Sequence, residues 1–316
     1  MRSRTLAGAA ATFSAAIVLA GCGSGTSSTA TGDSSTPPAS SGKGTVTISG
    51  QNFTEAEIVA DMYAGVLAKA GYTPKVKLVG TRDIYMKVFP KSVDVVPEYV
   101  GGILEFLNGS YNGANANPVT LSDPAKSITD AAPLLKKAKI TLLNPSPATD
   151  SNAFFVSKDY ADQNNVSTLS DLKGKSVVLA AAPDCKGRLD CEGGLASKYG
   201  IKITKILPLG YASQQTYDSV LHGESQLGET STTDGTLDSQ GLVLLTDDLK
   251  IQPAENLVPA VSSSFLAAHP DVADVLNQLM AALTTEKLTE LNAKVAVDRE
   301  KPQDVADQFL SDAGLS

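Results

Sequence analysis

The segment from Ile48 to Gly102 constrains the fold most strongly, because strand and helix patterns alternate within it. Thr54-x-x-Glu57 matches a capping box, which predicts the start of a helix. Apolar residues then recur at helical spacing from Ile58 to Leu67, and Gly71 follows as a stop signal. After a second helix, the short apolar run Val93–Val96 predicts a buried strand. The segment therefore predicts the strand–helix units of an α/β protein.

Tyr99 occupies a position at which α/β proteins bind ligands. It lies at the end of the predicted strand, next to Gly101-Gly102, where a third helix is predicted to begin. Ligands of open α/β sheets bind outside the carboxyl ends of the strands. A tyrosine face can hold a cation, and the amides of a helix start can hold an anion. The surroundings of Tyr99 therefore suit a small zwitterion.

The rest of the chain continues the alternation. A helix is predicted from Asp123 to Ala138, and three more are predicted between Asp271 and Ala313. This order predicts mostly parallel sheets. The further predicted strands are Ile140–Leu143, Ala153–Val156, Ser176–Ala181, Ile203–Leu207, Leu242–Leu245 and Val258–Val261.

Residues 1–43 carry the features of an exported lipoprotein. Arg2 and Arg4 precede an apolar run that is shorter than a membrane-spanning helix requires, which predicts an export signal over residues 1–21. Leu19-Ala20-Gly21-Cys22 resembles a bacterial lipobox, in which Cys22 receives the lipid; the alternative is an ordinary signal peptide with a chance cysteine. Residues 22–43 are rich in Ser, Thr and Gly and predict a flexible linker. We expect a protein anchored by lipid at the extracytoplasmic face of the bacterial cell membrane.

Charge and composition exclude several functions. The chain has 26 basic and 34 acidic residues, a formal net charge of −8, which is unfavourable for binding nucleic acid. The body after the linker is long enough for two modest domains with a core. No Gly-x-Ser-x-Gly elbow is present, and the two histidines lack an evident nucleophile, so we expect no enzyme.

Cys185 and Cys191 bracket a short loop. In an exported protein we expect them to form a disulfide, with two free thiols as the alternative. A zinc site would need further ligands, and His222 and His269 lie in unrelated segments. We therefore expect no metal and no cofactor.

Five motifs in a fixed order carry a family resemblance. They are Asn52–Glu55 (NFTE), Gly80–Lys87 (GTRDIYMK), Val96–Gly102 (VPEYVGG), Ser231–Gly235 (STTDG) and Leu283–Val295 (LTTEKLTELNAKV). With these motifs the chain resembles the substrate-binding lipoproteins of ABC importers for osmoprotectants such as glycine betaine, choline and carnitine, the OpuAC/ProX-like family.

The resemblance implies an α/β, two-lobe fold of the periplasmic-binding-protein type II, with a ligand cleft between the lobes. Lobe 1 would comprise residues 44–148 and 245–316, and lobe 2 residues 149–244. The chain would cross near Pro147–Asp150 and near Leu242–Thr246. Hinge closure would then bury the ligand.

The resemblance also implies ligand-binding residues. A quaternary ammonium is recognised by aromatic faces and nearby negative charge, and the chain has no tryptophan. Tyr99 and Tyr217 match cage tyrosines of the family, and Arg188 matches an arginine that reaches a ligand carboxylate. Asp150 would supply negative charge or cap the crossover. The other residues expected at the ligand are Gln51, Tyr85, Gly102, Asn152 and Thr233.

Some positions depart from the family pattern. Asp150-Ser151-Asn152 and Gln240-Gly241 stand where betaine binders carry tyrosines, and Gly102 replaces a hydroxyl residue. Arg82 is a second candidate for the anionic end of a ligand, with a surface ion pair as the alternative. Thr233-Asp234 is expected to cap a helix.

We therefore expect a receptor that captures a quaternary ammonium or betaine-type osmoprotectant and delivers it to an ABC permease. One alternative keeps the receptor and changes its ligand to another small polar or aromatic solute. A second is a tethered solute sensor without transport, and a membrane-anchored hydrolase is the third.

Overall fold

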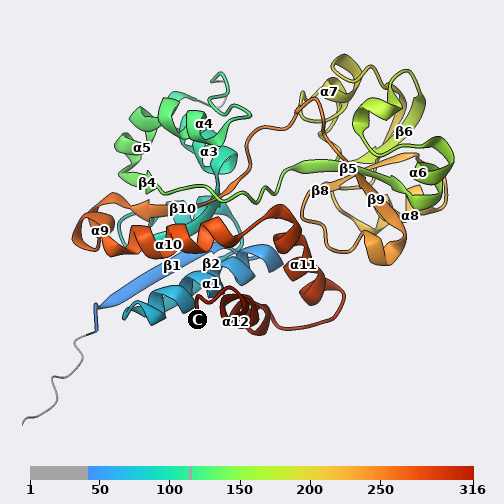
Figure 1. The fold of residues 1–316 in the computed structure, drawn as a ribbon. Coiled ribbons are helices and arrows are strands. Elements are labelled where there is room, and N and C mark those ends of the chain that lie inside the picture. The colour runs from blue at the N-terminus through green and yellow to red at the C-terminus, as the bar shows by residue number, and fades with distance from the viewer. Residues whose placement is uncertain (1–41, 114–115) are drawn as a thin grey trace, which may run out of the picture. The chain divides into compact units, whose positions relative to one another are not determined.

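The computed structural model describes residues 42–113 and 116–316 (Figure 1). The predicted export signal, Cys22 and nearly all of the predicted linker lie outside these residues. Within the described ranges, no helix combines the length and the apolar character that crossing a membrane requires.

The first sheet has five strands in the order β2-β1-β3-β10-β4. The pairs of β1 with β2 and β3 are parallel, whereas β10 runs antiparallel to both of its neighbours, β3 and β4. The strands are β1 (Thr45–Gln51), β2 (Thr73–Val79), β3 (Val95–Tyr99), β4 (Ile140–Leu142) and β10 (Leu257–Ser262).

The second sheet also has five strands, in the order β7-β6-β8-β5-β9. Here β6 is parallel to β7 and β8, and β5 is antiparallel to β8 and β9. The strands are β5 (Asn152–Ser157), β6 (Ser176–Ala181), β7 (Lys202–Pro208), β8 (Leu227–Ser231) and β9 (Leu242–Leu245).

Helices connect the strands and close the chain (Figure 1). Helix α1 packs against α10 and α12 over the first sheet, so the C-terminal helices return to the part of the fold in which the chain starts. The helices are α1 (Thr54–Lys69), α2 (Arg82–Met86), α3 (Val100–Asn112), α4 (Pro124–Asp130), α5 (Ala132–Ala138), α6 (Lys158–Asn164), α7 (Glu192–Ser197), α8 (Gln214–Leu221), α9 (Ser263–Ala268), α10 (Asp271–Ala282), α11 (Thr285–Ala296) and α12 (Pro302–Asp312), with 3₁₀ turns at Leu169–Leu172 and Asp238–Gln240.

The chain crosses between the two sheets twice. It leaves the first sheet after Leu142 and enters the second at Asn152, and it returns between Leu245 and Leu257. Each sheet has its own buried clusters: Ile58 and Met62 are fully buried with the first sheet, and Phe154 is buried with the second. Two α/β halves therefore share one chain through these crossing segments.

The expectation of mostly parallel sheets holds for four of the five strands in each sheet, which run in the same direction, but both sheets are mixed because one strand in each, β10 or β5, runs the opposite way. The antiparallel strands have a common cause: β5 is the first strand after one crossing, and β10 is the first strand after the other. A strand that arrives from the other sheet is not constrained to the direction that a strand–helix–strand unit imposes. The sequence pattern alone carries no information about these directions.

Two local predictions also need correction. The capping box at Thr54 is absent, because Phe53 holds the N-cap position and no side chain caps the helix. The helix predicted from Asp123 to Ala138 is divided at Ala131 into α4 and α5, since Pro133 lies in the first turn of α5 and has no amide proton to donate. The stop signal at Gly71 is confirmed, with a φ of +97°.

Candidate ligand-binding site

A cavity of about 600 Å³ lies where several strands of both sheets end. Glu55 reaches it from the start of α1, just after β1, and Tyr211 reaches it from the loop after β7. Asn292 lines it from α11. The remaining lining residues are Phe53, Thr54, Asp150, Ala212, Tyr217, Ser231, Thr233, Asp234, Gly235, Thr236 and Ala296. The position matches the rule that α/β proteins bind ligands at the carboxyl ends of strands.

A larger cavity, of about 740 Å³, lies elsewhere, against α2, α3 and α5. It is lined only by residues of the half that contains the first sheet. It combines an apolar floor, including Phe89 and Phe106, with lysines such as Lys87 and Lys137. Size does not identify the functional site, and the smaller cavity carries the aromatic and acidic groups that the sequence analysis predicts.

Two carboxylates, the buried Glu55 and the half-buried Asp150, dominate the electrostatics of the smaller cavity. Glu55 is 3% exposed; its Oε1 accepts a hydrogen bond from the Tyr99 hydroxyl at 2.5 Å, and its Oε2 accepts one from Asn292 Nδ2 at 2.7 Å. Burial, and then the negative charge of Asp150, raise the pKa of Glu55 to about 7. Burial also raises the pKa of Asp150, although the Thr233 hydroxyl donates to its Oδ1 at 2.9 Å.

A third carboxylate, Asp234, is held firmly by its neighbours. Its Oδ2 accepts from the Tyr217 hydroxyl at 2.6 Å, and its Oδ1 accepts from the Thr236 backbone amide at 3.0 Å. The expectation that Thr233-Asp234 caps a helix is wrong, because the next helical element in the chain is the 3₁₀ turn Asp238–Gln240, and its N-cap is Leu237. A carboxylate that holds a turn in this way fixes the tyrosine bound to it.

Aromatic rings surround the acidic groups. Phe53 stacks on Tyr99, with ring centroids 6.5 Å apart, and Tyr217 packs against Phe155 at 5.4 Å. Tyr211 is 43% exposed and lines the cavity from the loop after β7. The cavity thus offers rings from both halves of the chain.

The structure brings some of the predicted ligand-binding residues together. Asp150, Tyr217 and Thr233 line the cavity. Tyr99 lies directly behind the lining, since it contacts Phe53 and donates its hydroxyl proton to Glu55. These are residues from four separate parts of the sequence.

Five other predicted residues, Arg188 among them, do not line this cavity. Tyr85 is buried in the hydrophobic core and donates its hydroxyl proton to Glu98. Gln51 ends β1 without reaching the lining, and Gly102 lies against Arg82, whose Nη2 would be 2.4 Å from an added Cβ atom. Asn152 lines a different cavity, of about 470 Å³, beside the crossing segments.

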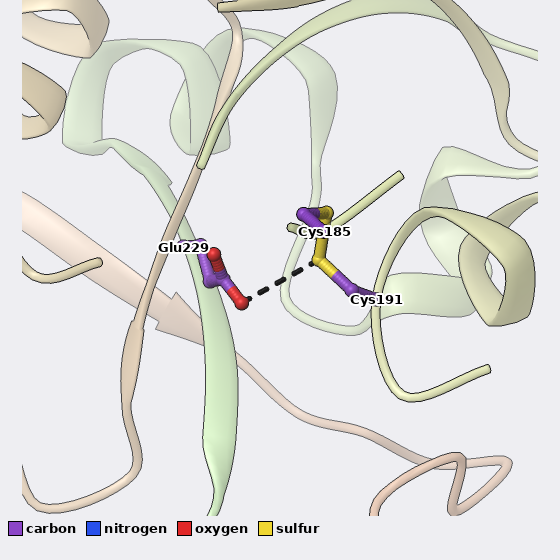
Figure 2. Close-up of side chains that lie close together, drawn as sticks. All are labelled: Cys185, Cys191 and Glu229. Atoms are coloured by element: carbon purple, nitrogen blue, oxygen red, sulfur yellow. Dashed lines mark hydrogen bonds between the residues drawn. A yellow bond between two sulfur atoms is a disulfide. The ribbon is translucent and has the colours of Figure 1, made fainter. Parts of the chain in front are cut away.

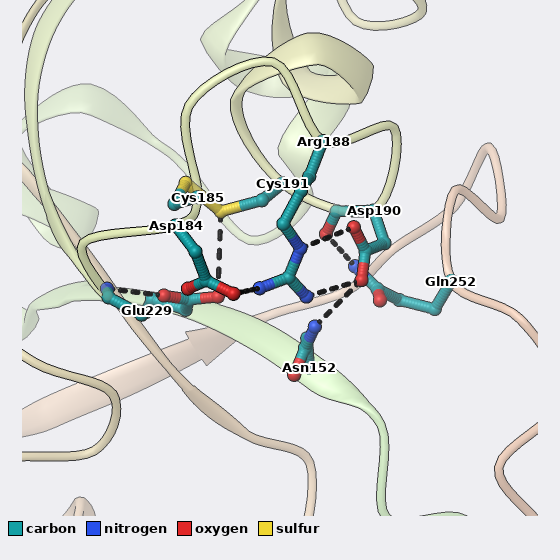
Figure 3. A network of polar contacts seen from close by, with 9 residues as sticks. Asn152, Asp184, Cys185, Arg188, Asp190, Cys191, Glu229 and Gln252 are labelled. Atoms are coloured by element: carbon teal, nitrogen blue, oxygen red, sulfur yellow. Dashed lines mark hydrogen bonds and ion pairs between the residues drawn. A yellow bond between two sulfur atoms is a disulfide. The ribbon is translucent and has the colours of Figure 1, made fainter. Parts of the chain in front are cut away.

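Arg188, predicted to reach a ligand carboxylate, is paired with carboxylates of its own chain (Figure 3). Its Nε and Nη2 atoms donate to the two oxygens of Asp190 at 3.0 and 2.6 Å, and its Nη1 donates to Asp184 at 3.1 Å. Asn152 donates to the same Asp190 carboxylate at 3.1 Å. The guanidinium therefore has both edges occupied.

The predicted disulfide between Cys185 and Cys191 is present (Figure 2). Glu229 lies beside it, with Oε1 3.5 Å from the sulfur of Cys191. Three potential metal ligands meet at this point, but a disulfide sulfur is not a thiolate and does not ligate zinc as one does. The bond closes the loop that carries Arg188.

The sequence analysis missed Glu55, Tyr211 and Asn292. Tyr211 follows Gly210 shortly after β7, so the rule on strand ends that singled out Tyr99 applies to it as well. Glu55 and Asn292 lie in two of the family motifs, but the sequence does not show that they contact each other, because they are far apart in the chain.

Two mixed α/β halves joined by two crossing segments, with a cavity lined from both, define a two-lobe solute-binding protein of type II. Residues 44–312 match the family described as the substrate binding domain of the ABC-type glycine betaine transport system. The chain belongs to this family. It is therefore an extracytoplasmic binding protein of an ABC importer and not an enzyme.

Individual relatives agree with the family assignment. The chain is 26% identical over 273 residues to the glycine betaine-binding protein YehZ of Escherichia coli, covering 83% of this chain and 88% of that protein. It is also 26% identical over 284 residues to a glycine-betaine-binding protein of Pseudomonas aeruginosa, covering 86% of this chain and 88% of the relative.

Solved structures show the same fold. A structure described as a glycine betaine/carnitine/choline ABC transporter superposes with a TM-score of 0.73 at 21% identity, covering 85% of this chain and 99% of that one. Apo YehZ of Escherichia coli gives a TM-score of 0.70 at 24% identity, covering 86% of this chain and 99% of that one. The predicted two-lobe type II fold is confirmed.

Proposed function

We propose that this chain captures a small quaternary ammonium solute in the cavity around Asp150 and delivers it to the permease of an ABC importer. The combination of Tyr211 and Tyr217 with Asp150 and Glu55 supports this function. A quaternary ammonium has no proton to donate, so aromatic faces and nearby negative charge are what a protein can offer it. Each aromatic contact contributes on the order of 0.5–2 kcal/mol.

The relatives point to the same class of ligand. The matching proteins of Escherichia coli and Pseudomonas aeruginosa are both named as binding glycine betaine. Betaines and choline share the trimethylammonium group that the aromatic and acidic lining suits. Tyr99 supports the site from behind, through its hydrogen bond to Glu55.

Closure of the two halves on the ligand is part of this function. The cavity is lined by Glu55 and Asn292 from elements that pack with the first sheet and by Tyr217 and Thr233 from elements of the second. Movement about the crossing segments after Leu142 and after Leu245 would bring these groups around the solute. A shut cavity is the form that a permease would distinguish from the empty receptor.

We also propose that Cys22 carries a lipid and that the segment after it tethers the binding domain to the membrane. The sequence around Cys22 supports this anchor. One acyl chain anchors only marginally, so stable retention requires two or more chains. Metabolic labelling with a fatty acid tests the anchor, and a Cys22→Ser variant that still incorporates the label would disprove it.

Calorimetric titration of residues 42–316 tests the ligand class. The panel contains glycine betaine, choline and carnitine, with the uncharged polyol sorbitol as the comparison. We expect at least one quaternary ammonium compound to bind, and sorbitol not to bind. If no quaternary ammonium compound binds to the refolded, ligand-free protein, the proposed function is wrong.

Aromatic variants test the location of the site. Tyr217→Ala and Tyr211→Ala are each expected to weaken binding about tenfold, which corresponds to roughly 1.4 kcal/mol. Tyr111→Ala is the matched control, because Tyr111 is a partly exposed tyrosine of the other, larger cavity. Equal loss of affinity in all three variants would contradict the assignment of the site.

A further inference from the structure

The groups that would bind an anionic end of a ligand are already occupied in this chain. At the start of α3, the amide of Gly101 donates to the carbonyl oxygen of Ala254 at 2.8 Å, and the amide of Gly102 donates to Oε2 of Glu255 at 3.1 Å. Glu255 Oε1 would lie 2.3 Å from a Cβ atom added to Gly101. A carboxylate of the protein itself therefore holds the helix start that the sequence suggested for a ligand carboxylate.

Both candidate arginines are occupied as well. Arg82 donates from Nε and Nη2 to the two oxygens of Glu98, each at 2.9 Å, and Arg188 is bound in the same bidentate way to Asp190. A ligand carboxylate would have to displace one of these protein carboxylates. Among the residues that line the cavity, none of those described is a lysine, an arginine or a histidine.

Asn292, one of the residues that line the cavity, also carries a buried hydrogen-bond acceptor without a donor. Asn292 Nδ2 donates to Glu55 Oε2 at 2.7 Å and to the carbonyl oxygen of Thr233 at 3.0 Å. Two acceptors on one side fix the orientation of the amide, because the reversed amide would place oxygen against oxygen. Asn292 Oδ1 then finds no donor within residues 42–113 and 116–316, and a buried acceptor left in this state costs free energy.

We propose that this site selects an organic cation that carries a hydroxyl donor and no carboxylate, such as choline, over the zwitterionic betaines. The inference rests on the proposed function and specifies the ligand of the same cavity. The positive group would lie among Tyr211, Tyr217, Asp150 and Glu55, and the hydroxyl proton would go to Asn292 Oδ1. A betaine offers no such proton and adds a negative charge to a lining that already holds three carboxylates.

The raised pKa of Glu55 agrees with this charge balance. Burial and the neighbouring Asp150 raise it to about 7, so the free site resists holding all of its negative charges at once. A cation relieves more of this repulsion than a zwitterion does, because the carboxylate of the zwitterion adds a negative charge of its own. The free acidic site is therefore better matched by a ligand with a net positive charge.

Three compounds with one headgroup test the proposal by calorimetry at pH 8, on the refolded ligand-free protein. Choline and glycine betaine share the trimethylammonium group and differ in the hydroxyl or carboxylate at the other end. We expect choline to bind at least about tenfold more tightly. Glycine betaine binding equally well or better would overturn the proposal while leaving the proposed function intact, and no binding by any quaternary ammonium compound would reject both.

Choline methyl ether separates the hydroxyl proton from the charge. It keeps the cation and loses the donor, so we expect it to bind several-fold more weakly than choline. Equal affinities of the two cations would show that no acceptor in the site binds the hydroxyl proton of choline, and would overturn that part of the proposal.

Variants assign the effect to residues. Asp150→Asn is expected to weaken choline several-fold and to leave glycine betaine unchanged or tighter, so the ratio of their affinities falls. Asp162→Asn, an exposed change on α6, is the control and keeps the wild-type ratio. An unchanged ratio in a folded Asp150→Asn protein would contradict the charge argument, and the comparison of ligands on the wild type stands even if this variant fails to fold.

Discussion

Glu55 gives the free protein a pH dependence of stability that can be isolated with one substitution. The carboxylate is 3% exposed, and burial together with Asp150 raises its pKa from an ordinary value of 4.5 to about 7. Between these pH values the folded protein binds a proton at Glu55 that the unfolded chain has lost. The contribution of this proton is fully present below pH 4.5 and is lost as the pH rises through 7, so stability falls over that window.

The size of the effect follows from the two pKa values. Each pH unit between them is worth about 1.4 kcal/mol, so Glu55 accounts for a loss of about 3 kcal/mol between pH 4.5 and pH 8. Glu55→Gln removes the titrating group and keeps an acceptor for the Tyr99 hydroxyl. Its new amide faces the Asn292 amide, which is a cost, but one that does not change with pH.

Urea unfolding of the ligand-free proteins at pH 4.5, 5, 6, 7 and 8 measures this effect. The quantity to compare is the free energy of unfolding of Glu55→Gln minus that of the wild type. We expect this difference to increase by roughly 3 kcal/mol as the pH rises from 4.5 to 8. Glu255 and Asp61, whose pKa values burial raises to about 7 and about 6, titrate in both proteins and largely cancel in the difference.

An exposed change, Glu224→Gln, is the control and should follow the wild type at every pH. A gap between Glu55→Gln and the wild type that stays constant from pH 5 to pH 8 would refute the reasoning, because it would show that Glu55 is already ionised in the folded protein at pH 5. A gap that narrows as the pH rises would reverse the sign of the argument.

Three further predictions concern packing and cross-links. Gly235→Ala places a Cβ atom 2.4 Å from a backbone nitrogen of α11. Because Gly235 lines the cavity, we expect the shift that relieves this clash to lower ligand affinity at least about tenfold. Unchanged affinity in calorimetry would contradict the close approach. Arg82→Met removes the ion-pair partner of the buried Glu98 carboxylate, which then keeps only its hydrogen bonds from the Tyr85 hydroxyl and the Tyr99 amide. We expect the free energy of unfolding to fall by about 3–5 kcal/mol, and a loss below about 1 kcal/mol in urea would show that the pair is dispensable. The double variant Cys185→Ser with Cys191→Ser should lose about 2 kcal/mol, and reductant should affect the thermal unfolding of the wild type and not of the variant; equal sensitivity would argue against the bond.

Strands that are continuous apolar runs were predictable from the sequence. Ser176–Ala181 and Leu242–Leu245 coincide with β6 and β9, because buried strands select apolar residues at successive positions. β2 was missed, since Thr73–Val79 contains Pro74 and lysines, as suits an edge strand that is largely exposed. The strand directions depend on the route of the chain between the sheets, which local patterns do not encode.

Site residues were predictable where their own position in the sequence indicated a role. They were not predictable where the role depends on a contact with another residue. Asp150, Tyr217 and Thr233 line the cavity, and their role in binding stays a prediction for the titrations. Arg188 shows the opposite limit: its position in the loop was clear, but nothing in the sequence indicated that Asp190 would hold it in a fork. Pairing between charged side chains depends on geometry that residue types alone do not give.

The place of β10 in the first sheet affects how this protein folds as it emerges from the export machinery. The strand separates β3 from β4, yet it begins only at Leu257. While residues 143–256 are still emerging, the edges of β3 and β4 that β10 will join have no partner, and the sheet has a gap between these two strands. The two ends of the chain must therefore meet late, and we expect the domain to reach its native state only after nearly the whole polypeptide has crossed the membrane.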